Sequence, residues 1–341
     1  MLNDILEKIA RREDLTADEM ATAVGAFVDH DCEPAQIAGF LMALRVKGET
    51  VDELVGAAMA FRERAVRLPD TVRPVLCTAG TGGDRFGSIN LSTAAALIAA
   101  AAGVPVAKHG NRSVSSRCGS ADVLDALGVP TGLSPQGAAA AIRDSNFSFL
   151  FAPHYHPAMK SVAPVRKALG VSTLFNLLGP LTNPARVPTQ VVGVFHPSRT
   201  RFMAEALLRL GVERALVISA ECGLDEVAPA GRTRLVEVGG GTLTERLVSP
   251  ADFGLAERPV DSVRGGDPAF NARIIRTVLE GRDVPARTGI LLNAAAALYA
   301  AGAAGSLKDG AELAARTVDS GAAAATLARV SYAAEPQAVA A

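Results

Sequence analysis

The chain of 341 residues is long enough for one large domain or two unequal domains around a sizeable core. It carries 34 basic and 35 acidic side chains, so its net charge of −1 provides no overall attraction for nucleic acid or an anionic membrane. Hydrophobic residues make up 49% of the chain and aromatic residues only 4%, which favours a helix-rich α/β enzyme over a β-sandwich or a disordered chain. We therefore expect small-molecule partners, with no nucleic acid and no membrane.

The cysteine pattern bears on the cellular compartment. Cys32, Cys77, Cys118 and Cys222 are scattered and form no Cys-x-x-Cys pair, which argues against a zinc ribbon or a disulfide scaffold. The charged N-terminal residues lack the apolar core of a signal peptide. The longest apolar run, 94–102, is too short to span a bilayer. The sequence predicts a soluble, cytoplasmic protein.

The first 66 residues predict helices only. Apolar residues from Leu2 to Ile9 recur on one helical face. The segments 16–19 and 50–53 resemble capping boxes that begin two more helices, and Glu33-Pro34 begins another. Since no strand pattern interrupts them, we expect a small helical domain over 1–66, followed by a linker.

From Val75 onward, strand and helix patterns alternate, which predicts a mostly parallel sheet flanked by helices. The expected strands are 75–79, 104–108, 148–152, 191–195 and 215–219. Segment 289–302 predicts a buried alanine-rich helix. The fold class is therefore α/β, with a small N-terminal helical domain, a larger α/β domain over 74–332, and a flexible tail at 333–341.

A glycine-rich turn at 80–87 separates the first expected strand from a helix that opens on Asn90, Ser92 and Thr93. Glycines allow close backbone approach, and the unsatisfied N–H groups and dipole of a helix start attract phosphate or carboxylate. The dinucleotide fingerprint is excluded because Arg85 stands where its third glycine is required, and the P-loop lysine is missing. The segment indicates an anion site of another kind, the alternative being a tight turn with a plain helix cap.

A second loop, 108–122, follows the second expected strand and carries Lys108, His109, Arg112 and four serines. Ligands of open parallel sheets bind at the carboxyl ends of strands, so we expect this loop beside the glycine turn. The combination suits a polyphosphate. The alternative, a solvated basic loop of nucleic-acid-binding type, lacks interleaved aromatic residues.

Two further segments carry ligand chemistry. Asp225 and Glu226 follow a strand, where one or two carboxylates suit Mg²⁺ that also binds substrate phosphates, although such pairs also occur on plain surfaces. His154 and His156 lack a nearby third ligand, so zinc is disfavoured. With Arg166 downstream, they suit a planar anion whose carboxylate accepts two parallel hydrogen bonds.

In their order along the chain, these motifs resemble the anthranilate phosphoribosyltransferase family. The motifs are Gly-Thr-Gly-Gly-Asp (80–84), Asn-Leu-Ser-Thr (90–93), Lys-His-Gly-Asn-Arg-Ser-Val-Ser-Ser (108–116), Gly-Ser-Ala-Asp (119–122), His-Pro-Ala-Met (156–159), Phe-Asn-x-Leu-Gly-Pro-Leu-Thr-Asn-Pro (175–184) and Gly-Leu-Asp-Glu (223–226). Each motif alone is weak, while the ordered set is specific and covers nearly the whole chain. Pyrimidine nucleoside phosphorylases share the fold, but the second loop, with Asn111, resembles the anthranilate family.

The resemblance implies transfer of the phosphoribosyl group of 5-phosphoribosyl 1-pyrophosphate to anthranilate in tryptophan biosynthesis, with Mg²⁺ as cofactor. It also implies a homodimer formed mainly through the helical domain, joined by helices from about 160–186. No general acid or base is assigned, because an aryl amine is largely unprotonated at pH 7.

By the same resemblance, three sets of residues form the site. Phosphoribosyl pyrophosphate is expected to contact Gly80, Gly83, Asp84, Ser88, Asn90, Leu91, Ser92, Thr93, Lys108, His109, Gly110, Asn111, Arg112, Ser113, Val114, Ser115, Ser116 and Ser120. Anthranilate is expected to contact Gly80, Asn111 and Arg166, with His109, Tyr155 and His156. Mg²⁺ is expected on Ser92, Asp225 and Glu226.

Three positions depart from the family's usual pattern: Ser172 stands in place of arginine, Ile89 in place of phenylalanine, and Cys118 in place of serine. The change at Ser172 removes a positive charge near the expected acceptor path. Two alternatives follow: a related transferase or nucleoside phosphorylase with another acceptor, and a non-catalytic nucleic-acid-binding relative. The balanced charge disfavours the second.

Overall fold

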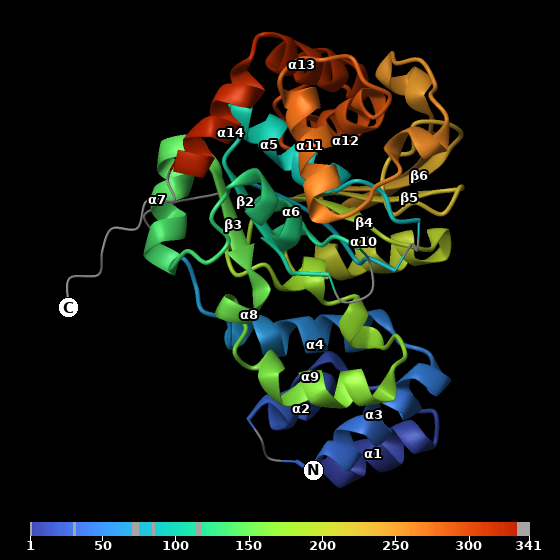
Figure 1. Ribbon diagram of the computed structural model, residues 1–341. Coiled ribbons are helices and arrows are strands. Elements are labelled where there is room, and N and C mark those ends of the chain that lie inside the picture. The colour runs from blue at the N-terminus through green and yellow to red at the C-terminus, as the bar shows by residue number, and fades with distance from the viewer. Residues whose placement is uncertain (1, 30–31, 70–74, 84–85, 114–116, 333–341) are drawn as a thin grey trace, which may run out of the picture.

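The computed structural model describes residues 2–29, 32–69, 75–83, 86–113 and 117–332, and it shows a helical part stacked against a larger α/β part (Figure 1). The expected tail at 333–341 lies outside these residues. The helical part begins with four helices: α1 (Leu2–Ala10), α2 (Ala17–Val28), α3 (Pro34–Lys47) and α4 (Val51–Glu63). Both predicted capping boxes are confirmed, since Thr16 and Thr50 each exchange hydrogen bonds with the glutamate three residues later.

A later stretch of chain returns to these helices. Two helices, α8 (Ala152–Tyr155) and α9 (Met159–Leu169), precede two 3₁₀ turns, η1 (Leu174–Asn176) and η2 (Gly179–Thr182). Apolar side chains of α9, η1 and η2 share one hydrophobic cluster with those of α1–α4. Figure 1 shows α9 beside α2 and α3, which come much earlier in the chain.

The central sheet has seven strands in the order β3-β2-β1-β4-β5-β6-β7. The first five are parallel: β1 (Leu76–Gly80), β2 (Val106–Gly110), β3 (Phe147–Phe151), β4 (Thr189–Gly193) and β5 (Arg214–Ala220). The predicted α/β class is confirmed, and each predicted strand is displaced by only one or two residues.

Two antiparallel strands at one side of the sheet, β6 (Thr233–Gly239) and the edge strand β7 (Thr242–Val248), were not predicted. They form a hairpin around Gly240 and Gly241, both of which have positive φ. Most side chains of β7 are exposed and polar, so the strand lacks the continuous apolar run of the buried strands.

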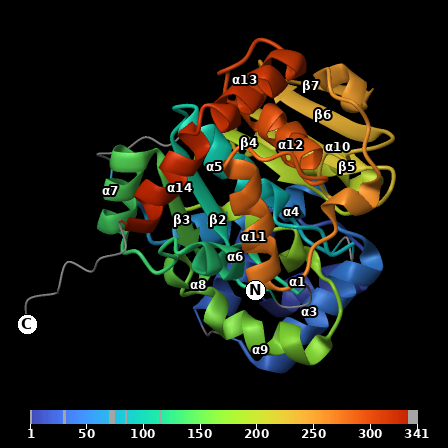
Figure 2. The same ribbon diagram turned by 45° about the horizontal axis from the view of Figure 1, so that its top comes forward.

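The helices of the α/β part cover both faces of the sheet. Six of them are α5 (Leu91–Ala101), α6 (Ser120–Leu127), α11 (Pro268–Leu279), α12 (Arg287–Ala300), α13 (Leu307–Asp319) and α14 (Ala322–Tyr332). A further helix, α7 (Pro135–Ser145), packs beside β3, and α10 (Thr200–Arg209) covers the face toward the helical part. Figure 2 shows α5, α11, α12, α13 and α14 grouped together over the sheet.

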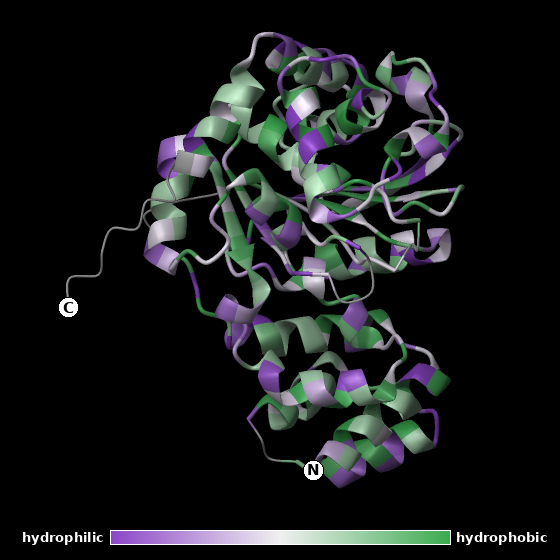
Figure 3. Cartoon of the chain, in the orientation of Figure 1, coloured by the Kyte–Doolittle hydropathy of each residue, from purple (hydrophilic) through white to green (hydrophobic). Residues whose placement is uncertain are grey.

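The interior of this helical layer is built from small apolar side chains. Helix α12 confirms the predicted buried alanine-rich segment, and it packs directly on α5. Figure 3 shows the sheet and these inner helices mostly in green. Such small side chains bring two helices close together, which fixes the start of α5 against the strand ends. Within the described residues, no helix combines the length and apolar character needed to cross a membrane.

Three parallel strands end on glycine at the same edge of the sheet: β1 at Gly80, β2 at Gly110 and β4 at Gly193. The chain leaves β1 toward β2 and β3, and later returns to the other side of β1 as β4. The order of strands therefore reverses between β1 and β4. In open α/β sheets, a crevice for ligands forms at such a reversal.

Candidate functional site

Asp225 occupies the crevice between β1 and β4. Its Oδ2 accepts a hydrogen bond of 3.1 Å from the backbone N–H of Gly82. A Cβ atom on Gly80 would lie 2.6 Å from that oxygen, and a Cβ on Gly193 would overlap the carbonyl oxygen of Asp225. Both strands must therefore end on glycine to admit the carboxylate. The sequence analysis missed Gly193. The one sign of its role in the sequence is its position at the end of an apolar strand.

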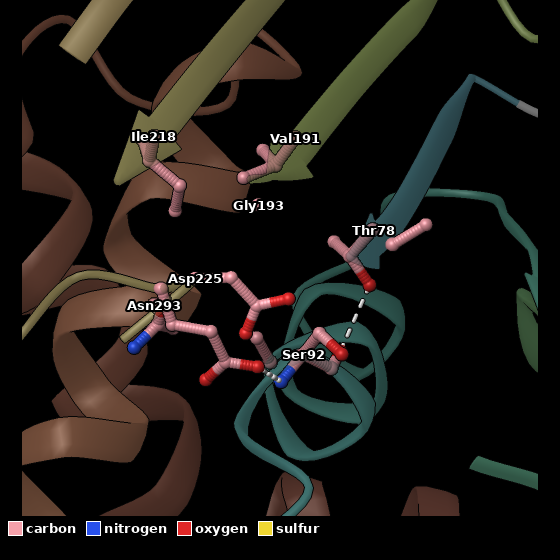
Figure 4. Close-up of a pocket in the computed structure, with 10 residues that line it drawn as sticks. Thr78, Ser92, Val191, Gly193, Ile218, Asp225 and Asn293 are labelled. Atoms are coloured by element: carbon pink, nitrogen blue, oxygen red, sulfur yellow. Dashed lines mark hydrogen bonds between the residues drawn. The ribbon is translucent and has the colours of Figure 1, made fainter. Parts of the chain in front are cut away.

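Glu226 reaches the start of α5 from the same loop. Its Oε1 accepts a hydrogen bond of 3.2 Å from the backbone N–H of Ser92, and the hydroxyl of Thr78 holds the carbonyl of Ser92 at 2.8 Å. Figure 4 shows Asp225 and Ser92 on the rim of a small cavity, together with Asn293 from α12. The predicted juxtaposition of Ser92, Asp225 and Glu226 is therefore present in the fold.

Lys108 lies beneath this cluster and is only 1% exposed. Its Nζ donates to the carbonyl of Thr78 at 2.6 Å and to the hydroxyl of Ser92 at 3.3 Å. Burial lowers the pKa of Lys108 to about 8, although nearby Glu226 favours its charged form. Its ammonium group therefore supports Ser92 from inside the protein, behind the surface that a ligand would meet.

The oxygen donors of this cluster fit Mg²⁺. Two adjacent carboxylates and one hydroxyl are hard ligands, and Mg²⁺ normally takes one or two carboxylates together with water and substrate phosphate. Among the described residues, no group of three or more His, Cys, Asp or Glu side chains forms a metal site. Two carboxylates and one hydroxyl suit a cation that is shared with a phosphate ligand.

The glycine turn and the second loop are joined side by side. Asn90 occupies the N-cap position of α5, but its side chain makes no capping hydrogen bond. Instead, its Nδ2 donates to the carbonyl of Cys118 at 3.2 Å, and the Cys118 thiol donates to its Oδ1 at 3.2 Å. The explanation of Asn90 as a plain helix cap is therefore wrong.

Arg112 directs its guanidinium group toward α6. It forms ion pairs of 3.0 Å with Asp122 and 2.6 Å with Asp125. Asp122 also accepts hydrogen bonds from the backbone N–H groups of Ser113 and Gly119. Asp122 thus joins the two ends of the second loop, a role that the sequence analysis missed. Because the guanidinium group of Arg112 is already paired with two carboxylates, it has less positive charge to offer a ligand than the sequence suggested.

Asn111 and Ser120 lie on the exposed side of the second loop. The Oδ1 of Asn111 accepts from the backbone N–H of Arg112 at 2.7 Å, and its carbonyl accepts from the hydroxyl of Ser120 at 3.2 Å. A Cβ on Gly110 would overlap the Ser120 hydroxyl, so the strand end must again be glycine.

His109 and His156 form a buried pair, 5% and 4% exposed, with ring centroids 5.1 Å apart. His109 Nδ1 lies 3.1 Å from the carbonyl of Gly179, and His156 hydrogen-bonds the backbone of Thr182. Because a carbonyl only accepts, His109 carries its hydrogen on Nδ1. Burial lowers the pKa of His109 to about 3 and that of His156 to about 4, so both rings are neutral at pH 7.

Each of these imidazoles leaves one nitrogen unused. Among the described residues, Nε2 of His109 and Nε2 of His156 have no hydrogen-bond partner. A buried polar atom without a partner is uncommon in a folded protein. The pair therefore offers acceptor positions for the N–H groups of a ligand.

Arg166, on α9, stands next to aromatic residues. Its guanidinium carbon lies 5.7 Å from the ring centroid of Phe175, and within the described residues it forms no ion pair or hydrogen bond. Burial lowers its pKa. Tyr155 is a core residue whose hydroxyl reaches the carbonyl of Leu133 at 3.5 Å. Arg166 is thus available to an anion, whereas Tyr155 belongs to a separate buried cluster that includes Cys77 and Leu150.

The remaining expected residues differ in how exposed they are. Gly83 and Ser88 are on the accessible part of the glycine turn, whereas Leu91 and Thr93 are buried and their backbone N–H groups donate to the carbonyls of Ile89 and Asn90. Asp84 and residues 114–116 lie outside the described residues.

Comparisons with known proteins show which family the chain is similar to. Residues 3–65 match the model of the glycosyl transferase family helical bundle domain, and residues 73–324 match the model of its a/b domain. An anthranilate phosphoribosyltransferase from Rubrobacter xylanophilus is 49% identical over 332 residues, covering 96% of each chain. Another, from Thioalkalivibrio sulfidiphilus, is 47% identical over 96% of each chain.

Solved structures give the same result. The anthranilate phosphoribosyltransferase of Thermus thermophilus has a TM-score of 0.91 and 45% identity, covering 96% of this chain and 98% of its own. The enzyme of Saccharomyces cerevisiae, in complex with phosphoribosyl pyrophosphate and Mg, has a TM-score of 0.89 and 27% identity over 97% of each chain.

Proposed function

The chain belongs to the anthranilate phosphoribosyltransferase family and transfers the phosphoribosyl group of 5-phosphoribosyl 1-pyrophosphate to anthranilate, and we propose that the crevice at β1 and β4 is where it does so. The product is N-(5'-phosphoribosyl)anthranilate, an intermediate of tryptophan biosynthesis, and pyrophosphate is released. The observation that carries this assignment is the convergence of the glycine turn, Ser92, Asp225 and Glu226 at the reversal of strand order.

The donor substrate occupies the carboxyl edge of β1 and β2. Its pyrophosphate lies against the glycine turn and the first turn of α5, where the helix dipole favours negative charge. Asn90, Asn111 and the hydroxyl groups of the second loop supply directional hydrogen bonds around it. This side holds the leaving group.

Asp225, Glu226 and Ser92 would hold Mg²⁺ beside the donor substrate. The ion would supply positive charge against the charge that develops on the departing pyrophosphate. The fold supports such binding because Gly82 and Ser92 already hold both carboxylates toward the crevice. The residues that hold the ion are thus positioned before the substrate arrives.

Anthranilate binds nearer the helical part, between the second loop and α9. Arg166 pairs with its carboxylate, and the unused Nε2 atoms of His109 and His156 accept hydrogen bonds from its amine. The amine nitrogen forms its bond to the anomeric carbon as the bond to pyrophosphate breaks, and the nitrogen then loses one proton to solvent. Because the aryl amine is neutral at pH 7, the site needs positioning and leaving-group stabilisation more than a strong base.

The enzyme works as a homodimer joined through its helical part, in the cytoplasm. Two exposed apolar residues favour this interface: Val46, 67% exposed at the end of α3, and Val171, 43% exposed after α9. They come from neighbouring segments, since Arg45 donates a hydrogen bond to the carbonyl of Ser172. A reducing compartment agrees with four cysteines, none of which is in a disulfide.

A fluorescence assay tests the reaction directly. Anthranilate fluorescence is expected to fall when enzyme, phosphoribosyl pyrophosphate and Mg²⁺ are present together, and to stay constant when any one of them is omitted. A parallel reaction with uridine or thymidine and inorganic phosphate is expected to release no free base. Constant anthranilate fluorescence with well-folded protein would rule out the proposed reaction.

A further inference from the structure

The side chain of Asn271, on α11, is hydrogen-bonded to the side chain of Asn90, the N-cap residue of α5. Asn271 is 1% exposed, and its Nδ2 donates to Oδ1 of Asn90 at 3.0 Å. Its own Oδ1 accepts from the backbone N–H of Gly266 at 2.8 Å. Asn271 therefore links Asn90 to the segment that enters α11, some 180 residues later in the chain.

The orientation of both amides follows from the fixed roles of backbone groups. The N–H of Gly266 can only donate, so Asn271 must present its oxygen there and its nitrogen to Asn90. Asn90 must then present its oxygen to Asn271. At the other end, the carbonyl of Cys118 can only accept, which independently requires the nitrogen of Asn90.

This arrangement leaves Asn90 able to donate one further hydrogen bond. Its oxygen already accepts from Asn271 and Cys118, and one of its two N–H groups is given to the Cys118 carbonyl. Among the described residues, the second N–H has no acceptor. Asn90 is therefore held as a hydrogen-bond donor at the start of α5, which suits an oxygen of the phosphoribosyl donor.

The same segment also braces the glycine turn through its backbone. The N–H of Ile89 donates to the carbonyl of Val263 at 2.9 Å, and the N–H of Gly265 donates to the carbonyl of Gly87 at 2.8 Å. A Cβ on Gly265 would lie 2.6 Å from backbone atoms of Ser88, so the two segments are in tight contact. The outer half of the turn thus rests on the entry to α11.

We propose that Asn271 is a positioning residue that locks Asn90 in its donor orientation and thereby sets the affinity for phosphoribosyl pyrophosphate. The proposal rests on the reaction proposed above. Asn271 is buried and its side chain also contacts the Cys118 thiol, which itself bonds Asn90, so its effect should fall on the substrate that Asn90 contacts.

Replacing Asn271 with aspartate should reverse the orientation of the Asn90 amide while changing the size of the side chain at position 271 very little. Asn271→Asp retains the acceptor for Gly266 but loses the donor to Asn90, so the Asn90 amide must turn and present its oxygen to the substrate. We expect the KM for phosphoribosyl pyrophosphate to rise about tenfold, the range for one hydrogen bond with a charged partner. The KM for anthranilate should change less than about twofold.

Two comparisons separate positioning from general stability. Ile275→Val truncates a fully buried apolar residue of α11 and should lower the melting temperature without raising the KM for phosphoribosyl pyrophosphate. In an Asn90→Ala background, Asn271→Asp should no longer change that KM, since the residue through which it acts is gone.

The outcomes are distinguishable. An inactive wild-type enzyme would contradict the proposed reaction. An active wild type with an Asn271→Asp variant that behaves like Ile275→Val, or that keeps its full effect in the Asn90→Ala background, would overturn the positioning role. A selective rise in one KM that disappears without Asn90 would support it.

Discussion

The donor side and the acceptor side of the site hold their polar groups in opposite ways. On the donor side, Asp225 and Glu226 accept hydrogen bonds from backbone N–H groups, and Lys108 is surrounded by oxygen atoms. On the acceptor side, His109 and His156 each retain an unused nitrogen among the described residues. The backbone therefore holds the polar groups of the donor side in place, whereas the acceptor side is formed by buried side chains with unused hydrogen-bonding atoms.

The difference predicts how substitutions separate by substrate. Changes on the donor side disturb a network that spans several strand ends, so they should alter the handling of phosphoribosyl pyrophosphate and of Mg²⁺. Changes on the acceptor side remove single contacts to a small aromatic acid. The two sides should therefore affect different Michaelis constants.

The largest effect is expected from Asp225→Asn. The substitution keeps the size of the side chain but removes a negative charge from the proposed Mg²⁺ site, so kcat/KM for phosphoribosyl pyrophosphate should fall by about 10²-fold. Steady-state kinetics at several Mg²⁺ concentrations measures this loss. Asp319→Asn, which removes an exposed partner of Arg287, is the control and should leave the kinetics unchanged.

The second-largest effect is expected from Arg166→Ala, and it should fall on anthranilate rather than on phosphoribosyl pyrophosphate. Loss of a charge-assisted hydrogen-bond pair should raise the KM for anthranilate by about 10- to 100-fold and the KM for phosphoribosyl pyrophosphate far less. Lys167→Ala, an exposed neighbour on α9, is the matched control. Equal increases in both constants for Arg166→Ala would contradict its assignment to the acceptor.

A smaller effect concerns stability against acid. The buried histidines have folded-state pKa values of about 3 and about 4, below the usual unfolded value of about 6.5. Between these limits the unfolded chain binds more protons, so the free energy of unfolding should fall as pH decreases below about 6.5, by about 1.4 kcal/mol per pH unit for each histidine. Urea unfolding at pH 7 and pH 5 measures this slope. His156→Gln should make it shallower, and an unchanged slope would show that the ring is already protonated.

The smallest effect is expected at Ser172, the position where the resemblance to the family leads us to expect arginine. Ser172 is exposed, and the guanidinium group of Arg45 already donates to its carbonyl. Ser172→Arg should therefore change the KM for anthranilate by less than about twofold, as surface substitutions usually do. A decrease of tenfold or more would show that the missing charge matters to the acceptor side.

Local signals made much of the fold predictable. The capping boxes at Thr16 and Thr50 and the apolar runs of the parallel strands each depend on short stretches of sequence. The hairpin of β6 and β7 was missed because β7 is mostly exposed and polar, so no apolar run marks it. An antiparallel edge strand can face water, and its pairing is decided by its neighbour rather than by its own composition.

The site was predictable in residue type but not in arrangement. The motifs identified Ser92, Asp225 and Glu226, which the fold brings together. They gave no sign that Arg112 pairs with Asp122 and Asp125, because that contact depends on how the loop folds onto α6. Gly193 and Asn271 were likewise missed, since a glycine at a strand end and a lone amide in a helix are common without any link to a ligand.

Calorimetric titration of inorganic pyrophosphate with Mg²⁺ tests the division of the site most directly, because it involves only the donor side. Wild-type protein and Arg166→Ala should bind it with the same affinity within about twofold, whereas Asp225→Asn should bind at least about tenfold more weakly. If Arg166→Ala weakened pyrophosphate binding as much as Asp225→Asn, the donor and acceptor sides would not be separate, and the account would be contradicted.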